Sequence, residues 1–395
     1  MLKGKTVVLG VSGGISAYKM ANIASKLVKL HADVHVIMTK KACNFINPIT
    51  FETLTKNKCI TDTFDRDFEF NVEHVSLAKK CDLFLVAPAT ANVIGKMANG
   101  ICDDMLTTTI FACKAPKLVA PAMNTNMYQN PILKDNLKKL EGYGFKIIKP
   151  ESGFLACGDE GEGRLPSDDV LIDSILAEIA FPHDLEGKNV LITAGPTKEA
   201  IDPVRYITNH SSGKMGYAIA NNAYLRGANV TLISGDVNVK AINGINVVNV
   251  KSALDMFEAV KDNYKNQDYI IMSAAIADYT PKSYSNDKIK KDDNDMTIEL
   301  SRTQDILKYL GENKKDNQKL IGFSMETKDL IENSTLKLNK KNADMICANS
   351  INGEKTGFKS DTNEITLIKR DGNKLLSLDT KENLAKLILD EIKEL

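Results

Sequence analysis

The sequence predicts an α/β protein of two domains, and three observations support that prediction. Short apolar runs alternate with helical segments along the chain, which is typical of parallel strands joined by helices. The pattern starts twice, at residues 6–11 and again at 189–193, and each start ends in a glycine turn. The 395 residues are enough for two or three domains. We therefore expect domains at 1–183 and 184–395.

The first domain is expected to hold a parallel sheet with helices on both faces, a flavodoxin-like or Rossmann-like arrangement. Its first strand is followed by the turn Ser12-Gly13-Gly14 and by a helix over 15–30. The further strands are expected at 34–38, 83–87, 118–120 and 146–148.

The second domain repeats this alternation, which predicts a C-terminal Rossmann-like α/β domain. Its strands are expected at 189–193, 229–233, 269–273, 320–323 and 344–347. A hairpin over 364–368 and 375–378 and a helix over 381–395 would close the chain, and the polar stretch 283–295 is expected to be a loop.

Composition limits the classes of function. Lys plus Arg equals Asp plus Glu, 51 each, so no basic field points to a nucleic acid partner. No apolar run reaches the roughly 18 residues of a membrane span, and the N-terminus lacks the layout of a signal peptide. The seven cysteines include no CxxC, which favours neither a disulfide framework nor a zinc site. A reducing cytoplasm is the expected location.

Glycines and polar residues follow the strands of the first half. Residues 10–16 open a helix after a strand, and this geometry suits either phosphate binding or a tight turn alone. Thr90 and Asn92 end the next strand, where open α/β sheets bind ligands, although Thr90 could simply cap a helix. Asn124 follows a third strand and suits recognition of a carboxylate or amide, or else an Asx-turn.

A glycine-rich segment, 153–166, is the most informative part of this half. Four glycines in eleven residues predict irregular structure, and Cys157 within it is expected to be accessible. A flexible loop that carries a thiol and Arg164 is typical of a lid. His74 precedes an apolar helix start, where a lone histidine is usually structural.

Together these segments resemble the homo-oligomeric flavin-containing cysteine decarboxylases, over nearly all of residues 1–180. The segments that carry the resemblance are Gly13-Gly14-Ile15-Ser16, His74, Pro88-Ala89-Thr90-Ala91-Asn92, Pro121-Ala122-Met123-Asn124 with Met127, and Ala156-Cys157-Gly158 through Gly163-Arg164. The one departure is Leu165, where a Met is expected after the arginine.

The resemblance implies that this half decarboxylates 4'-phosphopantothenoylcysteine with FMN. Oxidation of the substrate thiol to a thioaldehyde places the carboxylate β to C=S, so that CO2 can leave, and the reduced flavin returns the electrons. The residues implied to bind FMN are Ser12, Gly13, Gly14, Ser16, Thr39, Pro88, Thr90 and Asn92.

The resemblance also implies roles for the residues at the substrate. His74 would act at the oxidation and decarboxylation end of the site, and Asn124 would hold the substrate carboxylate. Cys157 would supply the proton when the enethiol intermediate is reduced. Met123 and Arg164 are assigned to substrate binding.

In the second half, Asn209 through Gly216 precede a helix. Gly213-Lys214 is followed by Met215, so this is not a Walker sequence. The order of strand, glycine and helix still suits phosphate binding. Asp278 at a strand end could hold Mg2+ or cap a turn. The cluster Lys288–Lys291 lies in a loop, where such runs are usually a solvated surface.

Lys337 and Lys341 are four residues apart on an expected helix and so share a face. With Phe323 at a strand end, they could hold a triphosphate and flank a base. The whole set is similar to phosphopantothenate–cysteine ligase over residues 187–395. The segments that carry this similarity are Ala194-Gly195-Pro196-Thr197, Asn209 through Gly216, Ala274 through Asp278, Lys288-Ile289-Lys290-Lys291, Gly322-Phe323 with Glu326-Thr327, and Asp344 through Asn349.

This similarity implies that 4'-phosphopantothenate is activated by CTP to an acyl-cytidylate, which the amine of L-cysteine attacks. Mg2+ and lysine side chains would supply the positive charge around the phosphates. Lys288 would assist acyl-cytidylate formation, and Asn209 would stabilise that intermediate. The residues implied to bind CTP are Ala274, Asp278, Asp305, Ile306, Phe323, Lys337 and Lys341, with Asp278 also binding Mg2+.

The order of the two halves matches bacterial bifunctional enzymes of coenzyme A biosynthesis. The resemblance implies decarboxylase trimers assembled into dodecamers, paired ligase domains, and no nucleic acid or membrane partner. A regulatory flavoprotein without catalysis and a decarboxylase of ribosomal peptides are the alternatives. The presence of Cys157 argues against a regulatory flavoprotein, and the attached ligase half argues against a peptide decarboxylase.

Overall fold

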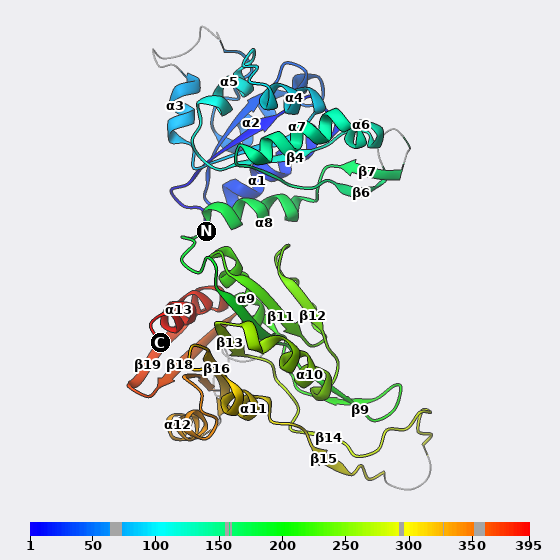
Figure 1. Cartoon of the computed structure of the whole chain (residues 1–395), viewed down its shortest axis with the longest axis vertical. Coiled ribbons are helices and arrows are strands. Elements are labelled where there is room, and N and C mark those ends of the chain that lie inside the picture. The colour runs from blue at the N-terminus through cyan, green and yellow to red at the C-terminus, as the bar shows by residue number, and fades with distance from the viewer. Residues whose placement is uncertain (64–72, 155–157, 159, 292–295, 327, 351–359) are drawn as a thin grey trace. The chain divides into compact units, whose positions relative to one another are not determined.

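The computed structural model describes residues 1–63, 73–154, 158, 160–291, 296–326, 328–350 and 360–395. The chain divides into two compact units, Met1–Pro182 and His183–Leu395, and each is described by itself (Figure 1). No helix in the described ranges is long and apolar enough to cross a membrane.

The first unit is built on a parallel sheet, which confirms the predicted fold class. Among the described residues this sheet has five strands in the order β2-β1-β3-β4-β5. The strands are β1 (Thr6–Val11), β2 (Asp33–Met38), β3 (Leu83–Ala89), β4 (Lys117–Pro121) and β5 (Phe145–Ile147). Every residue of β1 and β3 is buried, as expected for continuous apolar runs in the middle of a sheet covered on both faces.

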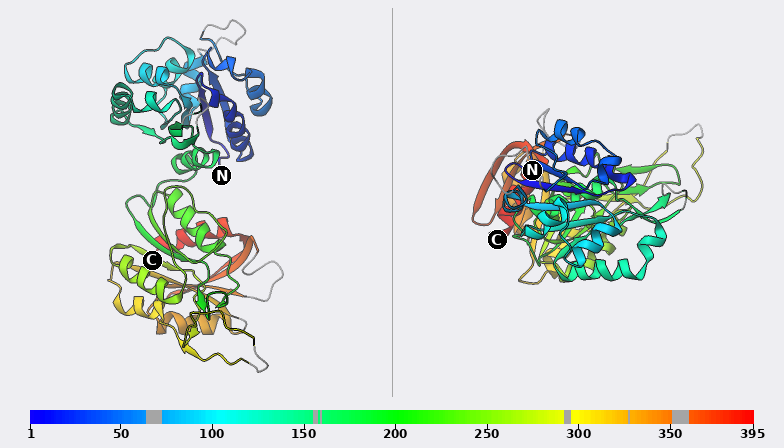
Figure 2. Two further views of the ribbon diagram at one scale, coloured as in Figure 1. Left: turned by 90° about the vertical axis from the view of Figure 1, so that its right-hand side faces the viewer. Right: turned by 90° about the horizontal axis from the view of Figure 1, so that it is seen from above.

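Helices cover both faces of this sheet (Figures 1 and 2). The helices that pack with the sheet in one core cluster are α3 (Glu73–Lys80), α4 (Ala91–Ala98), α5 (Met105–Ala112) and α7 (Pro131–Gly142). The helices that contact β2 and β3 from the other side are α1 (Met20–Lys29), α2 (Pro48–Thr55) and α8 (Asp168–Ile179). The helix expected over 15–30 begins as a 3-10 turn, η1 (Ile15–Lys19).

The glycine-rich segment contains a hairpin, so the prediction that its glycines forbid regular structure was wrong. Strand β6 (Glu151–Phe154) pairs antiparallel with β7 (Glu160–Arg164). The glycines serve close packing: a Cβ on Gly161 would lie 2.6 Å from the Thr125 hydroxyl oxygen, and one on Gly163 would lie 2.3 Å from the Met123 carbonyl oxygen. Glycine here lets the hairpin lie against the segment after β4.

The second unit contains a mixed sheet. In the part of the chain that is described, its eight strands follow the order β12-β11-β8-β13-β16-β17-β18-β19. They are β8 (Asn189–Ala194), β11 (Asn229–Ser234), β12 (Asn246–Asn249), β13 (Tyr269–Met272), β16 (Lys319–Glu326), β17 (Met345–Ser350), β18 (Thr362–Lys369) and β19 (Gly372–Thr380). The pairings from β12 to β17 are parallel, and β18 and β19 add the predicted antiparallel hairpin.

Two core clusters occupy the faces of this sheet. One contains side chains of α9 (Lys214–Leu225) and α13 (Lys381–Lys393), and the other contains side chains of α10 (Ala253–Asn263), α11 (Ile306–Asn313) and α12 (Leu330–Lys340). Phe323 lies within β16 and not at its end, because pairing with β17 continues to Glu326. Two short ribbons, β9 (Lys198–Ala200) with β10 (Tyr206–Thr208) and β14 (Tyr279–Pro281) with β15 (Leu300–Arg302), extend from the unit.

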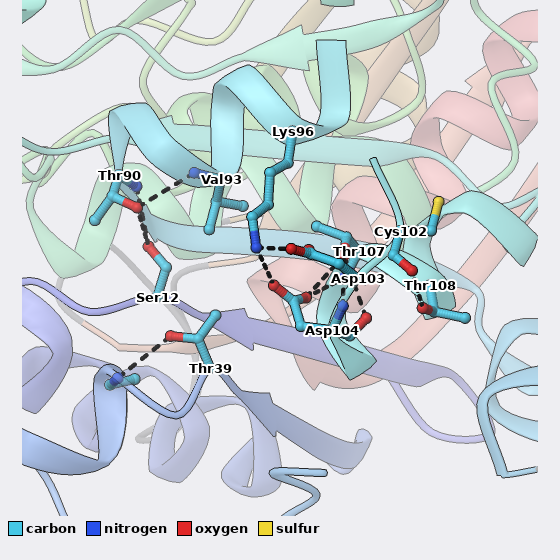
Figure 3. Close-up of polar contacts among 11 residues, drawn as sticks. Ser12, Thr39, Thr90, Val93, Lys96, Cys102, Asp103, Asp104, Thr107 and Thr108 are labelled. Carbon is cyan, nitrogen blue, oxygen red and sulfur yellow. Dashed lines mark hydrogen bonds and ion pairs between the residues drawn. The ribbon is translucent and has the colours of Figure 1, made fainter. Parts of the chain in front are cut away.

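The α4–α5 connection yields a stability prediction. Asp104 caps α5 by accepting from the Thr107 amide (2.9 Å), and it accepts from the Lys96 ammonium (2.9 Å; Figure 3). We expect Asp104→Ala to lower the free energy of unfolding by about 1–2 kcal/mol, the usual value of an N-cap. Asp103 also pairs with Lys96 but is more exposed, so Asp103→Ala should cost less than about 0.5 kcal/mol.

The same aspartate gives this effect a pH dependence. Burial alone would raise the pKa of Asp104, but the hydrogen bonds from Thr107 and Lys96 outweigh burial and lower it. A carboxyl group with a lowered pKa stabilises the fold above its unfolded-state pKa of about 4, and loses that contribution as pH falls through its folded-state pKa. Urea unfolding at pH 7 and pH 3 should therefore show a smaller difference between wild type and Asp104→Ala at pH 3. An undiminished difference would contradict this assignment.

Candidate functional site

The loops after β1 and β3 in the first unit are held together by Ser12. Its hydroxyl, fully buried, donates to the Pro88 carbonyl oxygen (2.6 Å) and accepts from the Thr90 amide (3.0 Å; Figure 3). The Thr90 hydroxyl in turn accepts from the Val93 amide at 3.5 Å and caps α4, so the capping alternative is realised. The Ser12 side chain therefore positions Thr90, which remains half-buried beside the exposed Asn92.

The loop after β1 also lies against the loop after β2. A Cβ on Gly13 would lie 2.6 Å from the Lys41 Cβ, so this close approach requires glycine. Thr39 joins the same loops, because its amide donates to the Val11 carbonyl oxygen at 3.0 Å. Gly13, Thr39 and Thr90 thus lie at the carboxyl ends of three adjacent strands, together with the half-buried Gly14 and Ser16. Open α/β sheets bind ligands at this edge, and glycine lets a phosphate approach the backbone there.

Asn124 lies at the end of β4, the next strand of the sheet. Its side-chain oxygen accepts from the Asn126 amide (2.9 Å) and caps α6 (Thr125–Gln129), so the turn-forming alternative is also present. The Met123 amide donates to the Gly163 carbonyl oxygen (2.9 Å), which brings the β6–β7 hairpin and its Arg164 to this strand end. The buried Thr125 hydroxyl beside them has no hydrogen-bond partner among the described residues.

Of the two other predicted catalytic residues in this half, the structure describes only His74. His74 lies half-buried in the first turn of α3, and in the described part of the chain no hydrogen bond links it to the strand-end residues. Cys157 lies outside the described residues, so its predicted role stays a prediction.

The second unit has a pocket of about 270 Å3 at the carboxyl ends of its parallel strands. It brings together Ala274, Asp278, Phe323 and Lys337 from the predicted set. The lining residues are Ser211, Ser212, Gly213, Lys214, Met215, Gly216, Ser273, Ala274, Ala275, Ile276, Asp278, Phe323, Ser324, Met325, Lys337, Asn349, Asn363 and Lys381. Asn209 lies next to it, since its side-chain amide donates to the Ala275 carbonyl oxygen at 3.0 Å.

The first turn of α9 forms one wall of this pocket. Gly216 lets the helix pack against the end of β8, because a Cβ there would lie 2.6 Å from the Ala194 Cβ. The N-cap residue is Gly213, which has no side chain to cap the first turn. Backbone N–H groups at the start of a helix attract anions, so this wall suits a phosphate group.

The pocket carries a net positive charge. In the described lining three lysines, Lys214, Lys337 and Lys381, stand against one acidic residue, Asp278. The Lys337 ammonium donates to the Phe323 carbonyl oxygen (2.8 Å), and burial lowers the pKa of Lys337. Lys381 is 4% exposed, donates to the Ser360 carbonyl oxygen, and also has a pKa lowered by burial. A pocket of this charge favours an anionic ligand.

Sequence reasoning did not single out Lys381 or Asn363 for this pocket. A signal for Lys381 was present: it is the first residue of α13, where the helix dipole disfavours a cation. Lys214 has the same position in α9. A lysine at the start of a helix is stabilised when an anion binds beside it.

The predicted residues Asp305, Ile306 and Lys341 form a neighbouring group outside the pocket lining. The Lys341 ammonium pairs with Asp305, which also caps α11 by accepting from the Lys308 amide (2.9 Å). Burial would raise the pKa of Asp305, but the hydrogen bond from Lys341 outweighs it, and the pKa is lowered. Ile306 is 2% exposed, so it would meet a ligand through its backbone.

Lys288 lies on the arm that contains β14 and β15, outside the pocket lining and exposed. Asp202, which is 2% exposed, anchors Ile289, the residue that follows Lys288. The Ile289 amide donates to the Asp202 carboxylate (3.2 Å), and the Arg205 guanidinium donates both to Asp202 (2.5 Å) and to the Ile289 carbonyl oxygen (2.8 Å). The Arg205 guanidinium holds the pKa of Asp202 well below its usual range.

This anchor yields a prediction for the ligase reaction that the resemblance of residues 187–395 implies. Asp202→Asn removes the charge that holds Arg205 and Ile289, so the backbone next to Lys288 should lose its fixed position. Given the role predicted for Lys288, we expect ligase kcat/KM to fall roughly tenfold or more, the effect of misplacing a reacting group. Decarboxylation of supplied 4'-phosphopantothenoylcysteine should be unchanged. The exposed Lys290, changed to Gln, is the matched control, and equal ligase rates in the two variants would refute the anchor.

Two family models match the chain, Flavoprotein over residues 1–180 and DNA/pantothenate metabolism flavoprotein C-terminal domain over residues 185–395. The Coenzyme A biosynthesis bifunctional protein CoaBC of Bacillus subtilis is 48% identical over 99% of this chain and 97% of that protein. The protein of the same name from Borreliella burgdorferi is 45% identical over 98% of this chain and 99% of that protein. The solved C-terminal domain of a CoaBC protein is 48% identical, with a TM-score of 0.46, over 53% of this chain and 96% of that one.

The matches define a flavoprotein whose second half is a pantothenate-metabolism domain. The chain belongs to the family of coenzyme A biosynthesis bifunctional proteins. It is therefore a bifunctional enzyme of coenzyme A biosynthesis, with a flavoprotein decarboxylase domain and a ligase domain.

Proposed function

We propose that the second unit couples 4'-phosphopantothenate to L-cysteine with CTP, and that the first unit decarboxylates the product with FMN. The observation that carries the ligase proposal is the positively charged pocket at the strand ends of the second unit. A nucleoside triphosphate has the charge that this pocket favours. The full-length likeness to bifunctional relatives supports the pairing of the two activities.

Different residues of the pocket would bind different parts of the nucleotide. The phosphates would be held by the first turn of α9 and by three lysines, Lys214, Lys337 and Lys381. Asp278 offers carboxylate oxygens to Mg2+, the ligand type that this ion prefers, and phosphate oxygens would complete its coordination. Phe323 would lie against the base, while Ala274 and the group of Asp305, Ile306 and Lys341 would border the nucleotide.

Two residues would then handle the acyl group. A carboxylate is a poor electrophile, and transfer to the nucleotide gives it pyrophosphate as a leaving group. Lys288 would neutralise the charge that develops as the acyl-cytidylate forms. Asn209, held by the Ala275 carbonyl oxygen, would stabilise that intermediate until the cysteine amine displaces CMP.

In the first unit, FMN would bind at the carboxyl ends of β1, β2 and β3, where Gly14 leaves the backbone open to a phosphate because a Cβ there would meet only Thr90 and Pro88, at 3.8 and 3.9 Å. The residues that would hold FMN are Ser12, Gly13, Gly14, Ser16, Thr39, Pro88, Thr90 and Asn92. FMN supplies a reversible two-electron oxidation of the substrate thiol, which makes loss of CO2 feasible.

The other proposed roles belong to further residues of the first half of the chain. Asn124 would hold the substrate carboxylate, and Met123 and Arg164 would border the substrate. His74 would move a proton at the oxidation step, and Cys157 would donate one to the enethiol intermediate. We also propose a cytoplasmic homo-oligomer, with trimeric decarboxylase units assembled into a dodecamer and paired ligase units.

Removal of divalent cations tests the metal part of this proposal. With EDTA in excess, CMP formation from 4'-phosphopantothenate, cysteine and CTP should stop, because the nucleotide phosphates lose their counter-charge. Decarboxylation of supplied 4'-phosphopantothenoylcysteine should continue at its original rate. Added Mg2+ should restore CMP formation, and ligation that persists in EDTA would contradict the assignment of Asp278.

A further inference from the structure

Two lysines that line the pocket of the second unit are the first residues of helices. Lys214 begins α9 and Lys381 begins α13, and side chains of both helices belong to one core cluster. The helix dipole disfavours a cation at the amino end of a helix, and two such cations in one pocket also repel each other. A negative charge beside them would therefore be stabilised.

The residues just before β18 supply such a charge from within the chain. The Asp361 carboxylate accepts from the Lys214 ammonium at 2.5 Å. The Asp361 carbonyl oxygen accepts from the Lys381 amide (2.9 Å), and the Ser360 carbonyl oxygen accepts from the Lys381 ammonium (2.5 Å). Asp361 is thus hydrogen-bonded to the first residue of both helices.

The Asp361 side chain is ionised at neutral pH. The hydrogen bond from Lys214 lowers the pKa of Asp361, and the charge of Lys381 adds to this effect. A carboxylate oxygen and a phosphate oxygen both accept charge-assisted hydrogen bonds from an ammonium group. Asp361 and a phosphate group in the pocket would therefore compete for Lys214.

The contact between Asp361 and Lys214 is one that a ligand can displace. The Asp361 side chain is 83% exposed and does not belong to the described pocket lining, whereas Lys214 does. An ion pair this exposed contributes little net stability, because water screens both charges. A triphosphate carries several negative charges, so beside the first turn of α9 it would attract Lys214 more strongly than one carboxylate does.

We propose that Asp361 is a displaceable competitor of the nucleotide phosphates. It pairs with Lys214 while the pocket is empty, gives way when the triphosphate of CTP binds, and pairs with Lys214 again as pyrophosphate leaves. Its charge therefore weakens phosphate binding and speeds the release of pyrophosphate. This role rests on the function proposed for the pocket, and it assigns part of the control of affinity to a residue outside the lining.

Removal of the Asp361 charge should strengthen phosphate binding. Calorimetry on the full chain with Mg2+ measures the Kd of CTP and of pyrophosphate for wild type and for Asp361→Asn. We expect both Kd values to fall roughly threefold or more in the variant, because a charge that repels the phosphates is lost. Glu364→Gln removes an exposed acidic side chain from β18 and is the matched control, with Kd values unchanged. Equal or larger Kd values in Asp361→Asn would overturn the proposal.

A double substitution shows whether Asp361 acts through Lys214. In protein that already carries Lys214→Gln, the further change Asp361→Asn should leave the Kd of pyrophosphate as it is, because substitutions of two residues in contact are not additive. A fall in Kd as large as in the wild-type background would refute competition at Lys214.

Wild type and Lys337→Gln separate this proposal from the function on which it rests. If wild type binds neither CTP nor pyrophosphate, or if Lys337→Gln binds CTP as tightly as wild type does, the pocket is not the nucleotide site and both proposals fail. If Lys337→Gln weakens CTP binding and Asp361→Asn leaves it unchanged, only the role of Asp361 is refuted.

Discussion

Replacement of Lys337 by Gln is expected to abolish most ligase activity and to leave the decarboxylase intact. Lys337 is a half-buried cation in the pocket that we propose binds the nucleotide, and its ammonium donates to the Phe323 carbonyl oxygen at 2.8 Å. A neutral side chain there would neither balance the nucleotide phosphates nor satisfy that carbonyl fully. Loss of one preorganised stabilising group typically costs 10²–10³ in rate, so we expect CMP formation to fall by roughly that factor.

The control for this variant lies on the same helix. Lys340 is exposed at the end of α12 and does not line the pocket, so Lys340→Gln should keep full ligase activity. Both variants should decarboxylate supplied 4'-phosphopantothenoylcysteine at the wild-type rate. If Lys337→Gln forms CMP as fast as Lys340→Gln, the pocket is not the nucleotide site.

Replacement of Cys157 by Ser should have the second large effect, now confined to the first unit. A serine hydroxyl is a much weaker acid than a thiol, so the proton for the enethiol intermediate would be lost. General acid catalysis is worth roughly 10²–10⁴ in rate, and turnover should fall by that factor. An oxidised or enethiol form of the substrate should accumulate and be detected by mass.

The ligase reaction provides the internal control for this second variant, since CMP formation should be unchanged. Cys102→Ser, at an exposed cysteine assigned to neither active site, should keep both activities. Full turnover by Cys157→Ser would refute the assignment of the proton donor.

Much of the fold could be predicted from the sequence because buried parallel strands are continuous apolar runs. The strands predicted at 83–87 and 189–193 correspond to β3 and β8 within two residues at either end. Strand β12 was missed because its four residues, two exposed and two half-buried, lie at the edge of the sheet and form no long apolar run. The β6–β7 hairpin was missed because its glycines serve contacts with Met123 and Thr125, which local sequence does not reveal.

The sites could be predicted only where their residues follow strands. Gly13, Thr90, Asn124 and Asp278 follow strands, and the parallel order of the sheets brings each to the edge where ligands bind. Long-range contacts were not predictable: Asp202 anchors Ile289, 87 residues further along the chain. Lys381 joins the pocket of the second unit from the last helix, and neither spacing nor composition links it to Lys214.

The most direct test of the two proposed activities is one incubation of the purified protein. Its visible spectrum is recorded first, and 4'-phosphopantothenate, cysteine and CTP with Mg2+ are then added and the products are read by mass. The proposed function predicts a yellow protein that yields 4'-phosphopantetheine, CMP, pyrophosphate and CO2. A yellow protein that yields no product, even from supplied 4'-phosphopantothenoylcysteine, would contradict both proposed reactions.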